Sequence, residues 1–194
     1  MTIRLRRYPA EPMFLLHWHD PTKVAGDGGT YGVIPAGEFE PSSVALWDRH
    51  NDFELWRNIV REYAEELLGE PEHDGIRSQP IDYERWPLFQ RLQAARADGS
   101  VGVFLLGFNV SALTLFTNIL TVAVLGDDVF TDMIRLDGAV QRGRRDRRRR
   151  WWHSCRGRPV HRGGGAPDAG DRANDRLGRG LPRLAWKHRA ALGL

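Results

Sequence analysis

A reversal of charge near residue 138 constrains the fold of this chain more than any other feature of its sequence. Residues 1–138 carry 12 Lys and Arg against 21 Asp and Glu, a net charge of −9. Residues 139–194 carry 16 basic and 4 acidic residues, a net charge of +12, so the overall charge of +3 conceals two segments of opposite sign. Because such an asymmetry usually separates a domain from a tail, the sequence predicts an acidic globular body followed by a basic tail.

The apolar and glycine content refines this division into four segments. High charge with low apolar content cannot offset the entropy of ordering a chain, so the Arg- and Gly-rich part of the tail is predicted to be largely disordered. Apolar residues return near the C-terminus with the spacing of a short amphipathic helix. The predicted segments are an N-terminal extension (1–12), an α/β domain (13–138), the disordered segment (139–183) and the C-terminal helix (184–194).

The cysteine content and the uncharged segment 101–126 indicate the compartment. Cys155 is the only cysteine, so an intrachain disulfide is impossible, as is typical of proteins from reducing compartments. Residues 101–126 carry no charge over a length that would span a bilayer. Polar residues in the middle of this segment, together with two glycines, favour two strands flanking a helical turn instead. We therefore expect a cytoplasmic protein that does not enter the membrane.

Helical and strand periodicities alternate through the acidic body. The apolar patterns predict strands at 14–18, 30–34, 101–108 and 120–125, and helices at 52–68, 87–97, 112–118 and 127–134. Strands that alternate with helices are typical of a layered α/β fold with some parallel pairing. The fold class predicted from the sequence is therefore α/β.

The clearest predicted element is the helix over residues 52–68. Asn51 and Glu54 have the spacing of a capping box at its start, and Gly69 stands where a left-handed residue ends a helix. An apolar stripe follows the helix at helical spacing and is formed by Trp56, Ile59, Val60, Tyr63 and Leu67. This stripe predicts which face of the helix is buried.

The same helix carries the strongest candidate for chemistry. At about 100° per residue, Glu62, Glu65 and Glu66 share one flank beside the apolar stripe. Three adjacent carboxylates repel one another unless a cation bridges them, and hard oxygen ligands suit Mg²⁺. The alternative is a solvated acidic flank, with Arg57 and Arg61 as its partners along the helix.

Two segments resemble the signature of the Nudix hydrolases. Residues 35–43 resemble its glycine-containing loop, and residues 61–69, which begin Arg-Glu and continue to Glu-Glu, resemble its helix. The resemblance implies a Nudix-like mixed sheet with flanking helices, and magnesium bound by Glu62, Glu65 and Glu66. It also implies hydrolysis of a nucleoside-diphosphate-linked compound. Ser43 stands where the family has a glutamate, and the loop and helix are farther apart in this sequence than in the family.

Longer parts of the sequence resemble the C-terminal region of actinobacterial helix-turn-helix transcriptional regulators of the XRE type. The similar stretches are 14–25, 32–43, 51–57 and 80–83. The resemblance implies a sensory or assembly domain that binds a small molecule and has neither catalytic residues nor a cofactor. It further implies that DNA is reached only through a helix-turn-helix, which this sequence lacks before residue 13.

The basic tail offers a third function. Residues 142–150 are rich in arginine and precede Trp151 and Trp152, a mixture found in segments that bind nucleic acids. Residues 142–162 are therefore predicted to contact nucleic acid electrostatically. A pair of compensating reading-frame shifts in the gene is an alternative explanation of the arginine and glycine bias. The sequence leaves three functions open: a sensory domain separated from its DNA-binding part, a divergent magnesium-dependent Nudix-type pyrophosphohydrolase, and a nucleic-acid binder.

Overall fold

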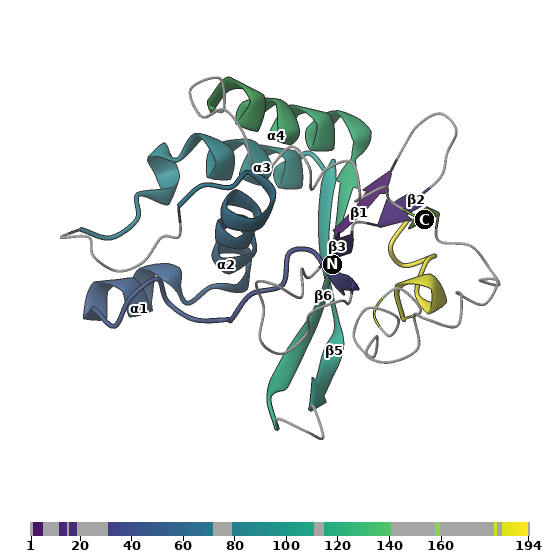
Figure 1. Cartoon of the computed structure of the whole chain (residues 1–194), viewed down its shortest axis with the longest axis horizontal. Helices are drawn as coiled ribbons and strands as arrows, with labels where there is room; N and C mark the ends of the chain where they lie inside the picture. The colour runs from purple at the N-terminus through teal and green to yellow at the C-terminus, as the bar shows by residue number, and fades with distance from the viewer. Residues whose placement is uncertain are drawn as a thin grey trace. The chain divides into compact units, whose positions relative to one another are not determined.

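The chain folds into a mixed α/β structure, as its sequence predicts (Figure 1). The structure is a computed structural model that describes residues 2–5, 12–14, 16–18, 31–71, 79–110, 115–140, 158–159, 181 and 184–193. Most of the segment predicted to be disordered (139–183) lies outside these residues. So does the predicted nucleic-acid contact at 142–162, except for residues 158–159.

The chain divides into two compact units. The sheet unit comprises Met1–Ile34, Gly102–Asp127 and Arg147–Leu194. The helical unit comprises Pro35–Val101 and Asp128–Asp146. Each unit combines segments that are far apart in the sequence, so this division differs from the body and tail that the charge pattern predicts.

The sheet unit contains a five-stranded sheet with the order β5-β6-β1-β2-β7. These strands are β1 (Thr2–Leu5), β2 (Pro12–Phe14), β5 (Val101–Val110), β6 (Thr117–Gly126) and β7 (Arg158–Pro159). Because β1 lies parallel to β6 and antiparallel to β2, the sheet is mixed. A separate antiparallel pair consists of β3 (Leu16–Trp18) and β4 (Tyr31–Val33).

The N-terminal residues supply the middle strand of the five-stranded sheet, where the sequence predicts only an extension. Ile3 of β1 is fully buried and is paired with Val124 of β6 on one side and with Phe14 of β2 on the other. A strand of four residues contains too little alternation to be recognised from its sequence. The single strand predicted at 14–18 is divided between β2 and β3, which belong to different sheets.

The uncharged segment 101–126 forms two neighbouring strands. The prediction of strands at 101–108 and 120–125 is confirmed by β5 and β6, and the side-chain amide of Asn118 donates to Asn109 Oδ1 at 2.9 Å across the pair. The helix predicted at 112–118 is wrong at residues 117–118, which begin β6, because β-branched residues 117, 119, 121 and 122 favour an extended chain. No described helix is long and apolar enough to cross a membrane.

The apolar core of the sheet unit combines both ends of the chain. It consists of Ile3, Val122, Val124, Leu181, Ala185 and Leu192. The predicted C-terminal helix (184–194) is helical at residues 184–187 and continues as turns over 188–193. The described C-terminal residues are thus part of this core.

The helical unit is built around α2 (Leu55–Glu62), which packs against α3 (Pro87–Ala97) (Figure 1). The other helices are α1 (Leu46–Asp52), the π-helical turn Tyr63–Leu67, the 3₁₀ turn Tyr83–Arg85, and α4 (Asp127–Val140), which begins at the last residue of a sheet-unit segment. The predicted stripe is confirmed, because its five members are all at most 8% exposed. The helix at 87–97 is confirmed with its bounds, and Gly99 behind it has a φ of 82°.

The predicted helix 52–68 is wrong at its start and right at its end. The chain leaves helical geometry at Phe53, and Glu54 is extended and makes no side-chain cap. Asn51 donates its side-chain amide to the carbonyl of Ile81 instead of capping a helix. At the other end Gly69 has a φ of 64°, as expected of a residue that ends a helix.

Candidate functional site

A buried polar network joins the segment 35–43 to α2 within the helical unit. Asp52, at the end of α1, is fully buried and lies 3.3 Å from Arg61 Nη1. Its carboxylate also accepts hydrogen bonds from the Tyr83 hydroxyl at 3.1 Å, the Asn51 amide at 2.9 Å and the Ser42 backbone N–H at 3.1 Å. A buried carboxylate needs such partners, because an uncompensated charge in the protein interior is strongly destabilising.

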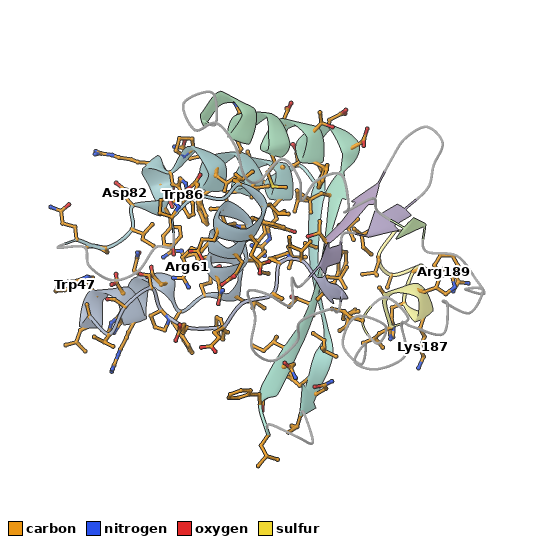
Figure 2. All side chains as sticks on the ribbon, in the orientation of Figure 1. Trp47, Arg61, Asp82, Trp86, Lys187 and Arg189 are labelled. Carbon is orange, nitrogen blue, oxygen red and sulfur yellow. The ribbon has the colours of Figure 1, made fainter. Side chains whose placement is uncertain are left out.

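Arg61 connects this network to the chain before α1. Its Nη2 donates to the backbone carbonyl of Glu40, while Nη1 makes the ionic contact with Asp52 without hydrogen-bond geometry. Figure 2 labels Arg61 where α2 faces α1. Burial raises the pKa of the Tyr83 hydroxyl well above its ordinary value, so Tyr83 stays protonated and keeps donating to Asp52. The segment 35–43 is therefore fixed to α2 through the interior of the unit.

The front of this segment, the loop 35–40, lies on the acidic flank of the helix. The backbone N–H of Ala36 donates to Glu66 Oε2 at 2.9 Å. The Glu62 carboxylate lies against the α-carbon of Gly37 so closely that a β-carbon at residue 37 would overlap it. On its other side Glu62 accepts a hydrogen bond from the Asn58 amide at 3.3 Å. A larger residue at position 37 would therefore have to displace the Glu62 carboxylate, the far end of a flexible side chain.

The carboxyl of Glu66 has unusual electrostatics for a side chain on an exposed residue. Desolvation raises its pKa from 4.5 to about 8, and the negative charges of Glu62 and Glu65 act in the same direction. The hydrogen bond from Ala36 opposes the rise but does not cancel it. The residue as a whole is exposed, whereas its carboxyl group lies where desolvation has the largest influence on its pKa.

Of the three glutamates predicted as metal ligands, the structure brings Glu62 and Glu66 to the same loop. The carboxylate of Glu62 lies against Gly37, and that of Glu66 accepts from the Ala36 N–H. The third residue, Glu65, is half-buried. No three His, Cys, Asp or Glu residues in the described part of the chain are arranged to hold a metal ion. The π-helical turn contributes to this, since its wider winding changes the angle between Glu62 and the two later glutamates. The magnesium site stays a prediction, and no chemical step is assigned to a metal.

Sequence patterns miss the network that positions these residues. Asp52 is expected to begin a helix, and Arg61 is expected to pair with glutamates along the helix, whereas the two lie buried against each other. Asn58 is also buried on α2, and its Oδ1 has no hydrogen-bond partner among the residues that the structure describes. A polar residue between apolar positions of a stripe is the one sequence signal that indicates such a contact.

Comparisons of the chain with models of known protein families, with curated proteins and with solved structures find no match. Functional inference therefore depends on the residues of this chain and on their geometry.

Proposed function

We propose that this chain is the sensory or assembly domain of a transcriptional regulator, with a Nudix-like arrangement of loop and helix as its ligand-binding site. The resemblance of residues 14–25, 32–43, 51–57 and 80–83 to the C-terminal region of such regulators supports the class of function. The contact between the loop 35–40 and the carboxylates of Glu62 and Glu66 supports the position of the site. Its ligand is a small molecule.

The observation that carries this proposal is that buried contacts hold the end of the loop at Glu40, while its start at Ala36 is bonded to the carboxyl of an exposed residue, Glu66. At the end of the loop, Arg61 donates to the carbonyl of Glu40 and is itself paired with the buried Asp52. At the start of the loop, the backbone N–H of Ala36 donates to Glu66 Oε2. A ligand that pairs with the Glu66 carboxyl competes with that hydrogen bond and changes how the loop is held. Because carboxylates accept but do not donate, the ligand is recognised through positive charge or hydrogen-bond donors.

Ligand binding is tested by thermal unfolding of the full chain with Mg²⁺, spermidine and nucleoside diphosphates as probes. A ligand of the folded state raises Tm by several degrees at concentrations far above its Kd. The rise should disappear in Glu66→Gln and persist in Glu84→Gln, a matched change at an exposed residue of the 3₁₀ turn. Equal shifts in the two variants would place binding elsewhere and overturn the proposed site.

The second candidate is a divergent Nudix-type pyrophosphohydrolase that depends on magnesium. The specific observation in its favour is that a glycine-containing loop packs on an Arg-Glu helix through Gly37 and Glu62. Such an enzyme should release phosphate or nucleotide from diphosphate compounds in the presence of Mg²⁺. Replacing a group that acts as a general base lowers the rate by roughly a hundredfold or more, so Glu65→Gln should abolish turnover. Binding without turnover favours the sensor.

A further inference from the structure

The strand β5 forms an open edge of the five-stranded sheet. In the order β5-β6-β1-β2-β7 it has a single neighbour among the described strands. An edge strand presents backbone N–H and C=O groups that pair readily with another strand, and proteins usually block such edges with charges, proline or short strands. The ten residues of β5, Val-Gly-Val-Phe-Leu-Leu-Gly-Phe-Asn-Val, include neither a charged residue nor a proline.

Large apolar side chains are exposed along this edge and its connection to β6. Leu105 is 53% exposed, Phe108 64%, Val110 60% and Leu115 76%. Because successive residues of a strand point to opposite faces, Leu105 lies on the face opposite to Phe104 and Leu106. Exposed apolar side chains of this size can mark an interaction site on a monomer. In the same strand Phe104 and Leu106 pack on the core of the sheet unit, so that core holds β5 in place.

The sequence of β5 specifies what can pair with it. When two identical strands pair antiparallel about a two-fold axis, each contact occurs twice, and the residue on the axis meets its own copy. A charge near the centre would therefore face a like charge, which is destabilising in a cross-strand pair. The centre of β5 is Leu105-Leu106, so self-pairing meets no such repulsion.

We propose that β5 pairs antiparallel with β5 of a second copy of this chain. The two five-stranded sheets then become continuous across a two-fold axis at Leu105, and the side chains of the two β5 strands become cross-strand neighbours. Pairing through one strand edge buries less surface per copy than the roughly 600 Å² at the lower end of the range for specific interfaces, so the dimer is weak. The dimer accordingly dissociates on dilution, and each copy folds without the other.

The experiment places opposite charges at the centre of the strand. The wild-type chain should sediment with twice the monomer mass of 22.1 kDa at high concentration and approach the monomer on dilution. Leu105→Glu and Leu105→Lys should each weaken association by at least about tenfold, because each faces its own copy. Mixing the two variants should restore the dimer, since the residues that meet then carry opposite charges.

The matched control is Leu46→Glu, the same change at a leucine of α1 that is 69% exposed. It should leave association unchanged. A wild type that stays monomeric at all concentrations overturns the proposal, as does a dimer that survives both charges at Leu105, or a mixture that fails to associate. If a monomeric wild type instead floats with phosphatidylcholine–phosphatidylglycerol vesicles, the exposed apolar side chains of β5 bind lipid and the proposal is overturned.

Hydrogen exchange of the wild type gives a measurement that does not depend on any variant. Amide protection in residues 101–110 should increase with protein concentration, whereas protection in α3 should not. Exchange in β5 that is the same at low and high concentration overturns the pairing.

Discussion

Asp52 and Arg61 place opposite charges inside the helical unit, where neither would be tolerated alone. Asp52 is fully buried and Arg61 is 5% exposed. A buried pair adds little net stability compared with apolar residues of the same shape, but removing one member leaves the other uncompensated. This asymmetry makes the pair a sensitive test of how the loop is anchored.

Replacing Arg61 by leucine should lower the free energy of unfolding by about 3 kcal/mol, because the Asp52 carboxylate remains buried without its cation. Urea unfolding of the full chain measures this change. The control is Arg85→Gln, which removes the partner that lies 3.5 Å from Asp82 Oδ2 in an ion pair whose side chains are both largely exposed. An exposed pair contributes less than about 1 kcal/mol, so similar losses in the two variants would contradict the anchoring role of Arg61.

Glu66 should make stability depend on pH in the direction opposite to that of an ordinary acid. Its pKa rises from 4.5 to about 8 on folding, so its contribution to stability is fully present below pH 4.5. That contribution is lost as the pH increases through about 8. The Tm of the wild type should therefore fall relative to that of Glu66→Gln between these values. The effect is small because water screens an exposed residue, and Glu84→Gln should run parallel to the wild type.

At the scale of elements, the contact between loop and helix is determined by shape as well as by charge. Helix α1 illustrates the same dependence on tertiary contacts. It buries Asp48 and Asp52, and it exposes Leu46 and Trp47. Figure 2 labels Trp47 at the outer side of the unit. The polar network accounts for this inverted pattern, since Asp48 accepts from the Ser43 hydroxyl.

Gly37→Ala should displace the Glu62 carboxylate and so weaken the contact of the loop with the helix, because the added methyl group would overlap that carboxylate. We expect faster proteolysis and faster hydrogen exchange in residues 35–40, with the exchange of α3 unchanged. The double variant Gly37→Ala with Glu62→Ala should recover most of the protection, since the overlapping carboxylate is then absent. Protection in the single variant equal to that of the wild type would show that the loop is held by other contacts.

At the scale of the whole molecule, residues from both ends of the chain build one apolar core. Leu192 is 4% exposed in a cluster that also contains Ile3 and Val124. A segment that supplies core residues cannot be removed without cost, even where its composition resembles that of a tail.

Leu192→Ala should lower the free energy of unfolding by about 2–3 kcal/mol, through lost burial and the cavity that it leaves. Chemical unfolding followed by circular dichroism measures this loss. Lys187→Ala, at an exposed position of the same C-terminal segment, should change stability by no more than about 0.5 kcal/mol. If Leu192→Ala and Lys187→Ala have the same free energy of unfolding, the C-terminal segment is not part of the core.

The sequence by itself determined the elements whose signals are local. The apolar stripe of α2, Pro87 and Gly99 around α3, Gly69 at the end of the π-helical turn, and the two strands of the uncharged segment follow from periodicity, fixed φ and β-branching. The grouping of Glu62 and Glu66 on one flank also follows from helical spacing.

Only the tertiary structure decided how distant residues meet. The pairing of β1 with β6, the contact of Asp52 with Arg61, and the burial of Leu192 join parts of the chain whose sequences carry no common pattern. These contacts form because buried charges need partners and apolar surface leaves water, and both requirements depend on position in space.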